Sequence, residues 1–387
     1  MNRPPKMSST DGVEMDQELA KRLLIEGATL VLLNVPPGTD FGVDMKSWNT
    51  GDKFKGVKMI PPGFHYIHYS AANGFDDLAP RVGFIHNFTK SEFLAMTWDA
   101  EKEDISTEAP SAETVNRLKQ NLASLDQYLG PYPYDIWEQW KGLTTKVDAA
   151  VIERCTPVCG YIRSALELEN CDDASRPRGG ETVQKRTRRS GLSAEDREQQ
   201  LLPQLKPRPG TELRLTKLPE KNYPDDATPA EVTQHSLDTS YALDAMLNQL
   251  KNPIEIIGEL QLAFVCFLSG QSLDAFEHWK KLVGLLCGAD AAISMRRAIF
   301  AEFLNTLEAQ VECVPEEMLC DIVASNNFVY HNLRNLFANI EASEKVDGRL
   351  KTQAVRLRDR LTKKFFWDFT CLQDEEDDEA PVVVSLD

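Results

Sequence analysis

The spacing of apolar residues changes along the chain, and this change restricts the possible folds more than any other feature. Between residues 28 and 98, apolar residues fall in short runs rich in aromatic and branched side chains, separated by glycine, proline or asparagine. Such runs are typical of β-strands. From residue 228 onward, apolar residues recur every three or four positions, as on one face of a helix. The pattern predicts an α+β fold, with a β-rich N-terminal domain and an all-helical C-terminal domain.

The N-terminal domain is expected to contain strands flanked by helices. The predicted strands are ATLVLLNV (28–35), VKMI (57–60), FHYIHYS (64–70), RVGFIHNF (81–88) and EFLAMTW (92–98). Their short connections favour antiparallel pairing. A helix is predicted from Ser111, its N-cap, to Gly130, with apolar positions at Val115, Leu118, Leu122, Leu125 and Leu129. A shorter, aromatic-rich helix should follow within 131–143, and both helices should cover a face of the sheet.

The C-terminal domain begins with a strong helix-start signal. In Thr228-Pro229-Ala230-Glu231, the threonine can cap the helix, proline suits its first position and glutamate can close a capping box. Helical segments are predicted near 229–250, 253–269, 272–287, 289–312, 315–325, 327–341 and 344–369. Gly270 and Gly288 should end two of them.

Two segments differ in composition from these domains. RPRGGETVQKRTRRS (176–190) carries six Arg or Lys residues, one Glu and no aromatic residue, and Pro203, Pro207 and Pro209 follow it. Such a stretch buries too little apolar surface to offset its ordering entropy. We therefore expect a β-rich domain over 1–160, a partly disordered linker over 161–210, a helical domain over 211–370 and an acidic flexible tail over 371–387.

The tail itself combines charge with strand propensity. Asp374 to Glu379 form the acidic run DEEDDE, which is expected to be solvated. Val382, Val383 and Val384 follow it, with high β propensity and no local partner. This arrangement indicates a strand that pairs with another molecule.

The overall charge restricts the class of partner. The chain has 60 acidic and 43 basic residues and a formal net charge of −17, so its surface repels phosphate backbones and suits a partner with basic surfaces. The N-terminus has no signal-peptide pattern, and the longest apolar run, Leu260–Leu268, is too short to span a membrane. We expect a soluble intracellular protein whose 8 scattered cysteines are thiols.

The sequence contains no complete catalytic or metal-binding motif, so we expect neither enzymatic activity nor a cofactor. Asp40-Phe41-Gly42 spells the magnesium tripeptide of kinases without their other motifs, and Gly42 is more simply a turn glycine. His65 and His68 lie three apart in a predicted strand, so they should point to opposite faces and be partly buried or surface residues, as should His86. Cys155 and Cys159 lack a second ligand pair and are read as ordinary helix-end cysteines.

Two basic stretches leave an alternative function open, that of an RNA-binding protein acting through residues 176–189 and 349–364. The first could contact RNA, act as a nuclear import signal or simply be solvated disorder. In the second, Leu350, Ala354, Leu357 and Leu361 recur at helical spacing, which favours an amphipathic helix with a solvated basic face. The net charge and the lack of a known RNA-binding signature argue against this alternative.

Several long stretches resemble the A-one cistron-splicing (AAR-two, AAR2) family. They include DQELAKRLLIEGATLVLLNVPPGTDFGVD, FKGVKMIPPGFHYIHYS, LDQYLGPYPY, ATPAEVTQHSLDTSYALDAMLNQL, GELQLAFVCFLSG, AFEHWKKLVGLLC, LTKKFFWDF and APVVVSLD, in family order. The resemblance implies a β-rich domain followed by a helical domain similar to VHS-type folds. It also implies a non-enzymatic pre-mRNA splicing factor of the cytoplasm and nucleus.

The resemblance further implies a role as an assembly chaperone for the spliceosomal U-five small nuclear ribonucleoprotein. The family binds the large core protein of this particle, bridges its RNase-H-like and Jab/MPN-like domains, and blocks premature access of RNA and the helicase. In the family, the C-terminal tail adds a strand between these two domains. That partner-binding role maps here onto Pro381, Val382, Val383, Val384, Ser385 and Leu386. The fitting mechanism is β-augmentation, with main-chain hydrogen bonds and valine pockets on the partner.

Overall fold

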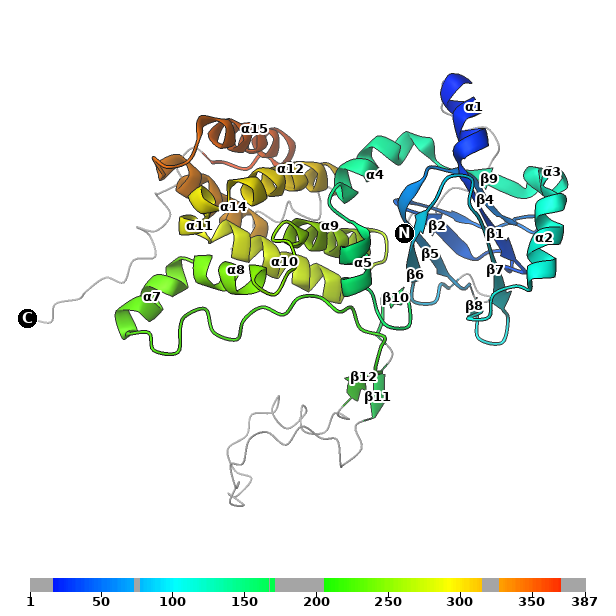
Figure 1. The fold of residues 1–387 in the computed structure, drawn as a ribbon, viewed down its shortest axis with the longest axis horizontal. Coiled ribbons are helices and arrows are strands. Elements are labelled where there is room, and N and C mark those ends of the chain that lie inside the picture. Colours follow the sequence, from blue (N-terminus) through cyan, green and yellow to red (C-terminus); the bar gives the residue numbers. More distant parts are fainter. Residues whose placement is uncertain (1–16, 73–76, 167, 171–204, 315–326, 370–387) are drawn as a thin grey trace, which may run out of the picture.

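The fold is seen in a computed structural model, which describes residues 17–72, 77–166, 168–170, 205–314 and 327–369 (Figure 1). The strands are β1 Ala28–Leu33, β2 Asp40–Val43, β3 Lys46–Asn49, β4 Gly56–Ile60, β5 Gly63–Ser70, β6 Val82–Phe88, β7 Phe93–Asp99, β8 Asp104–Ile105, β9 Leu129–Pro131, β10 Tyr161–Arg163, β11 Leu168–Asn170 and β12 Leu205–Pro207. The helices are α1 Gln17–Glu26, α2 Ala112–Gln120, α3 Leu122–Leu125, α4 Trp137–Thr144, α5 Ala149–Cys155, α7 Pro229–Leu237, α8 Ser240–Leu247, α9 Glu255–Leu268, α10 Leu273–Cys287, α11 Asp290–Met295, α12 Arg297–Cys313, α14 Phe328–Ala342 and α15 Gly348–Phe365. The predicted α+β fold class is confirmed.

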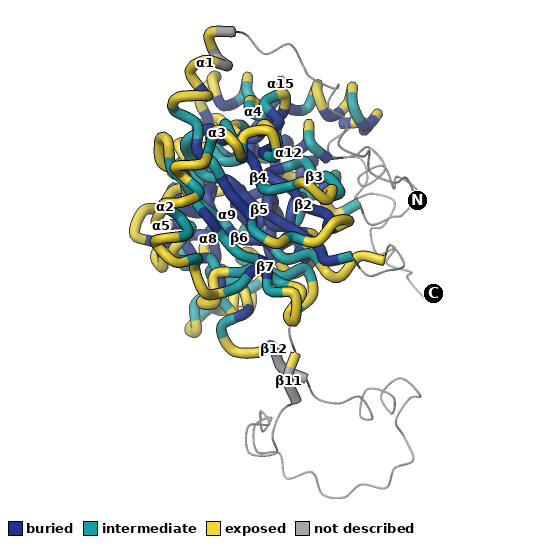
Figure 2. The backbone as a smooth tube through the Cα atoms, turned by 90° about the vertical axis from the view of Figure 1, so that its right-hand side faces the viewer, coloured by how far each residue is buried: buried dark blue, intermediate teal, exposed yellow. Residues whose placement is uncertain are grey.

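The N-terminal part contains two five-stranded sheets, in the orders β8-β7-β1-β4-β9 and β10-β6-β5-β2-β3. Antiparallel pairing was expected and holds for β1 with β4 and for β5 with β6. The pairs β1 with β7 and β4 with β9 are parallel, and they join strands distant in sequence, to which the expectation from short connections does not extend. The middle of the second sheet is enclosed, and β5 is buried over its last six residues (Figure 2).

The strands β2 and β3 were not predicted, because residues 40–49 lack an apolar run. Gly42, expected in a turn, lies within β2 opposite His68 of β5. A Cβ atom at Gly42 would lie 2.1 Å from the His68 ring, so this glycine makes room for the imidazole. The need for glycine here is therefore close packing across the sheet rather than turn geometry.

The predicted helix over 111–130 is interrupted. It forms α2 and α3, which are separated at Asn121, and a short 3-10 turn leads into β9. Gly130 lies within that strand instead of ending a helix, because Leu129–Pro131 pairs with β4. Val115, Leu118 and Leu122 pack on Val31, Ala95 and Leu129 of the first sheet, so the expected cover of a sheet face is confirmed for α2 and α3.

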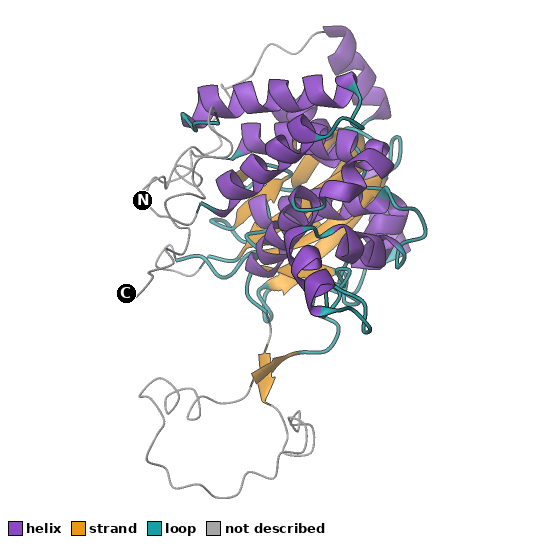
Figure 3. Cartoon of the chain, turned by 90° about the vertical axis from the view of Figure 1, so that its left-hand side faces the viewer, coloured by secondary structure: helices purple, strands orange, loops and turns teal. Residues whose placement is uncertain are grey.

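Helices α4 and α5 lie between the sheets and the C-terminal helices. Trp140 of α4 and Val151 of α5 belong to the same buried apolar cluster as Tyr66 of β5 and the core of α9. Trp140 stacks on Phe64 with a centroid distance of 5.6 Å, and its indole N–H donates to the Phe64 carbonyl at 2.9 Å. One apolar cluster therefore joins the second sheet to the C-terminal helices, while two smaller clusters fill the rest of the N-terminal part. In the view of Figure 3 the helices lie in front of the strands.

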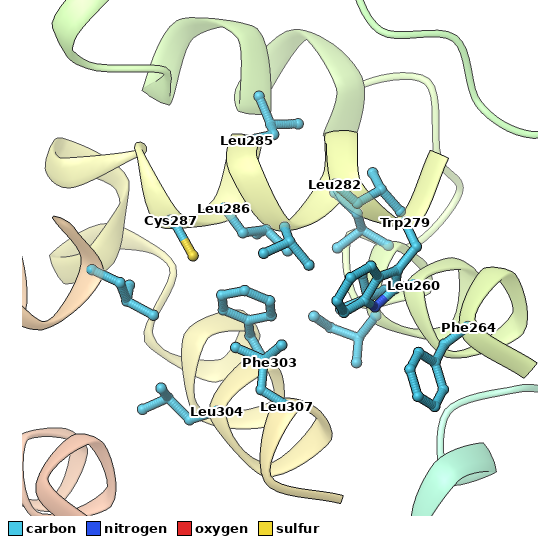
Figure 4. Close-up of a cluster of buried hydrophobic side chains, with 14 of the residues drawn as sticks. Leu260, Phe264, Trp279, Leu282, Leu285, Leu286, Cys287, Phe303, Leu304 and Leu307 are labelled. Carbon is cyan, nitrogen blue, oxygen red and sulfur yellow. The ribbon is translucent and has the colours of Figure 1, made fainter. Parts of the chain in front are cut away.

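The C-terminal helices are held together by a large apolar cluster. Leu282 and Leu286 of α10 point toward Leu260 of α9 and Phe303 of α12 (Figure 4). Phe264 of α9 lies beside Trp279 of α10, with a centroid distance of 5.7 Å. Side chains of this size each contribute roughly 1.5–3 kcal/mol when fully buried.

The boundaries of the predicted helices differ in detail. The segment 229–250 divides into α7 and α8, and the segment 289–312 divides into α11 and α12 at Arg296. The last helix ends at Phe365 instead of residue 369, and the predicted helix at 315–325 lies outside the described residues. None of the described helices is both long and apolar enough to cross a membrane.

Candidate protein-binding site

The C-terminal tail was predicted to carry the partner-binding residues Pro381, Val382, Val383, Val384, Ser385 and Leu386. These residues lie outside the described part of the chain, as does the acidic run at 374–379. Their role stays a prediction. The structure does describe how the chain reaches residue 369, and this defines where the tail starts.

An aromatic segment after α15 fixes the start of the tail. Phe365, Trp367 and Phe369 are buried, whereas Phe366 is 81% exposed and Asp368 is also exposed. The Phe369 ring lies 5.2 Å from both the Tyr330 and the Phe337 rings of α14, measured between centroids. The Tyr330 hydroxyl donates to the carbonyl oxygen of Asp368. The chain therefore leaves the helical domain from a packed position on α14.

Phe366 has an unusual backbone conformation at this point. It ends α15 with φ at 58°, in the left-handed region that glycine or asparagine usually occupies. The turn is stabilised because it places Phe365 and Trp367 in the core, where their rings stack at 4.9 Å.

The apolar face predicted for residues 349–364 is confirmed, because Leu350, Ala354, Leu357 and Leu361 are all buried in α15. The basic face, which was expected to be solvated, is partly paired with α12. Arg356 contacts Glu308 of α12 at 2.7 Å, and Arg360 contacts Glu308 at 2.9 Å and also Glu312. The ammonium group of Lys364 donates to the carbonyl oxygens of Val311 at 2.7 Å and Glu312 at 2.9 Å.

These contacts weaken the alternative of RNA binding through residues 349–364. Arginines that pair with glutamates on a neighbouring helix offer less net positive potential to a phosphate backbone than a solvated basic face would. The other basic stretch, residues 176–189, lies outside the described residues.

A buried polar cluster around Glu259 joins the helices to the preceding chain. The Glu259 carboxylate accepts hydrogen bonds from Arg154 of α5, from His278 of α10 at 2.8 Å and from the Thr216 amide at 2.7 Å. Burial opposes ionisation of Glu259, but the bonds from His278, Thr216 and Arg154 outweigh it and lower its pKa to about 2. The carboxylate is thus ionised and holds three segments together.

Arg81 joins the second sheet to the end of α9. Its guanidinium contacts the Asp40 carboxylate at 2.8 Å and donates to the Ser269 carbonyl at 2.8 Å. Neither Arg81 nor Glu259 was identified from the sequence, because single charged residues carry no pattern. The only available signal for Glu259 was a charged residue within the apolar spacing of residues 253–269.

His65 and His68 serve internal packing. His65 and His68 point to opposite faces of β5, as predicted, but both are fully buried rather than partly buried or on the surface. The His65 Nδ1 lies 2.7 Å from the Asp44 carboxylate, which also accepts from the Tyr132 hydroxyl. Burial, together with Arg81, lowers the pKa of His68 to about 3, so its ring is neutral. His86 is half-buried and contacts Glu92 at 2.7 Å.

The described cysteines are thiols and do not form a cluster. Cys155 is buried at the end of α5 and Cys159 is exposed beyond it. Burial and the nearby Glu259 raise the pKa of Cys155 to about 12, so it is not a thiolate at neutral pH. Among the described residues, no three His, Cys, Asp or Glu side chains are placed to hold a metal ion.

The fold and the site together define a class of protein in which a two-sheet N-terminal part packs on a helical domain with an anchored C-terminal tail. A family model described as the AAR2 N-terminal domain matches residues 26–157, and another described as the AAR2 C-terminal repeat region matches residues 215–370. The chain belongs to the AAR2 family, and the expectation of a splicing-related protein is supported to that extent.

Relatives of this family match nearly the whole chain. The protein AAR2 homolog of Homo sapiens is 40% identical over 387 residues, which cover 97% of each chain. The homolog of Mus musculus is 40% identical over 390 residues, again with 97% of each chain covered. The homolog of Caenorhabditis elegans is 33% identical over 369 residues, covering 93% of this chain and 99% of that protein.

Proposed function

We propose that this protein is an assembly chaperone of pre-mRNA splicing that binds the large core protein of the U-five particle. It bridges the RNase-H-like and Jab/MPN-like domains of that partner and blocks premature binding of RNA and of the helicase. It acts by stoichiometric binding, without catalytic turnover, in the cytoplasm and nucleus. Membership of the AAR2 family, together with the tail sequence APVVVSLD, supports this proposal.

The observation that carries the proposal is the anchoring of the chain at Phe369. Because Phe369 packs against Tyr330 and Phe337, residues 370–387 start from a fixed place on the helical domain. Eighteen residues in extended form could reach roughly 60 Å from that place. A strand at their end can therefore contact a large partner while the helical domain remains docked to it.

The chemistry of the tail fits β-augmentation. An edge strand offers main-chain donors and acceptors that Val382–Val384 can pair with, and alternate valines can enter pockets on the partner. Each main-chain hydrogen bond adds only about 0.5–1.5 kcal/mol net, so affinity requires several of them together with buried valines. The acidic run before the strand steers the tail to basic, RNA-binding surface.

The test is isothermal titration calorimetry with both partner domains present. Deleting residues 380–387 should weaken the joint complex by about tenfold or more, because each 1.4 kcal/mol of lost strand pairing is a factor of ten. Val383→Pro should reproduce much of this loss, since proline removes a main-chain donor. Val383→Thr keeps the donor and the β-branched shape and serves as the matched control.

Two outcomes would contradict the proposal. The first is unchanged affinity of the truncated protein for both partner domains. The second is tight binding of labelled U-five RNA in the absence of the core protein, which would instead favour the RNA-binding alternative. The thermal stability of the free protein should be the same with and without residues 380–387.

A further inference from the structure

Helices α14 and α15 form a groove of about 150 Å³ that is open to solvent. Its apolar lining includes Phe337 and Ile340 of α14 and Val355 of α15, and its charged lining residues are Lys351, Arg358 and Glu341. Val355 is 44% exposed, which is unusual for a valine in a helix whose other apolar residues are buried. The groove therefore presents apolar surface that another segment could cover.

The chain after α15 runs toward this groove. Trp367 contacts Tyr330, and Phe369, two residues later, contacts both Tyr330 and Phe337. The chain thus advances along α14 from residue 330 to residue 337. Phe337 itself lines the groove, and Ile340 lies one helical turn further in the same direction. Phe369 therefore contacts a residue that lines the groove.

The burial pattern of the same segment has a period of two. Phe365, Trp367 and Phe369 face the helices, whereas Phe366 and Asp368 face solvent. An extended chain that continues this alternation would direct Cys371 toward α14. Two residues advance an extended chain by roughly 6–7 Å, enough to bring residue 371 beside Ile340.

Charge favours the same occupant. The acidic run Asp374–Glu379 follows Cys371 by a few residues. Lys351 and Arg358 line the groove on α15, and Arg358 is paired only weakly, at 3.5 Å, with Glu341, whose side chain is 68% exposed. Such an exposed ion pair contributes little to stability, so Arg358 can pair with another carboxylate instead.

We propose that residues 370–379 of this chain dock in the groove between α14 and α15. Cys371 enters the apolar part of the groove, and the acidic run lies beside Lys351 and Arg358. Residues 380–387 then extend from the far end of the groove as a short free segment. This docking describes the free protein, in which the partner proposed above is not bound.

The test measures the alkylation rate of Cys371 in the full-length protein by mass spectrometry, against a synthetic peptide of residues 366–387. The peptide has the same neighbouring charges, so it corrects for their effect on the thiol. Docking should slow Cys371 on the order of tenfold or more relative to the peptide, because only the open state reacts. Cys159, which is exposed, should react at an unprotected rate in the same sample.

A substitution in the groove tests whether the groove causes the protection of Cys371. Val355→Asp places a charge in the groove at a half-exposed position and should return Cys371 to the rate of the peptide. The matched control is Leu273→Asp, at the exposed start of α10, which should keep the protection. An unprotected Cys371 in the wild type, protection unaffected by Val355→Asp, or protection that depends on protein concentration would each overturn the proposal. The last result would indicate a second copy in the groove.

Discussion

Replacing Glu259 with glutamine should destabilise the protein strongly at neutral pH and only slightly in acid. The depression of the Glu259 pKa from 4.5 to about 2 corresponds to roughly 3 kcal/mol of favourable interaction with the ionised form. Glu259→Gln removes this interaction, whereas Arg154, whose side chain is 27% exposed, keeps its contact with Glu255 at 3.6 Å. The expected loss at pH 7 is therefore roughly 3 kcal/mol.

The sign of the pH dependence follows from the lowered pKa. A carboxyl group with a depressed folded-state pKa stabilises the protein above its unfolded pKa and loses that contribution as pH falls through the folded pKa. The difference between wild type and Glu259→Gln should therefore be complete above about pH 4.5 and shrink toward pH 2.

Urea unfolding followed by circular dichroism at several pH values measures this difference. Glu138→Gln is the matched control, because the Glu138 side chain is 83% exposed in α4, and it should change stability by less than about 0.5 kcal/mol. A loss of unfolding free energy below about 1 kcal/mol at pH 7, or a loss of equal size at pH 3 and pH 7, would refute the conclusion that Glu259 is ionised and stabilises the fold through its hydrogen bonds.

Three further predictions concern packing and organisation. Gly270→Ala should destabilise the protein by about 1–3 kcal/mol in thermal unfolding, because the new Cβ would lie 2.3 Å from the Tyr66 hydroxyl and 2.5 Å from the Cys266 carbonyl oxygen. Gly348→Ala, which has open space around its new Cβ, should leave the stability unchanged. Phe369→Ala should destabilise by about 3–5 kcal/mol in chemical unfolding, while Phe366→Ala, at an 81% exposed side chain, should not; equal effects would contradict the alternating packing. Limited trypsin digestion should cut first within residues 176–189. The two fragments should elute together in size-exclusion chromatography, because α4 and α5 belong to the same apolar cluster as the helical domain. Early cleavage within 229–369 would contradict this prediction.

The sequence predicted those features that depend on repeated apolar spacing. The strands β1, β4, β5, β6 and β7 and the amphipathic face of α15 were found because burial of one face imposes a period on the chain. The capping of α7 was equally predictable from the sequence, since Thr228 and Glu231 form the expected capping box. These features depend on residues close in sequence.

Features that depend on distant residues were not predictable in the same way. The strand β9 forms because Leu129–Pro131 pairs with β4, and this pairing outweighs the helical pattern of the preceding residues. The strands β2 and β3 have no apolar run, and Gly42 is required by the His68 ring across the sheet. Arg81 contacts Asp40 and Ser269, and Glu259 contacts Arg154 and Thr216; each of these contacts joins residues more than 40 positions apart, and no spacing rule relates them. The tail residues 381–386 lie outside the described chain, so their role rests on the sequence and the family.

Hydrogen–deuterium exchange at the amides of Val382, Val383 and Val384 tests the proposed bridging strand most directly. The amides should exchange at the rate of an open chain in the free protein, because a lone strand has no partner for its backbone groups. They should become strongly protected when the RNase-H-like and Jab/MPN-like domains are both present, and much less so with either domain alone. Open-chain exchange in a fully formed joint complex would contradict the account.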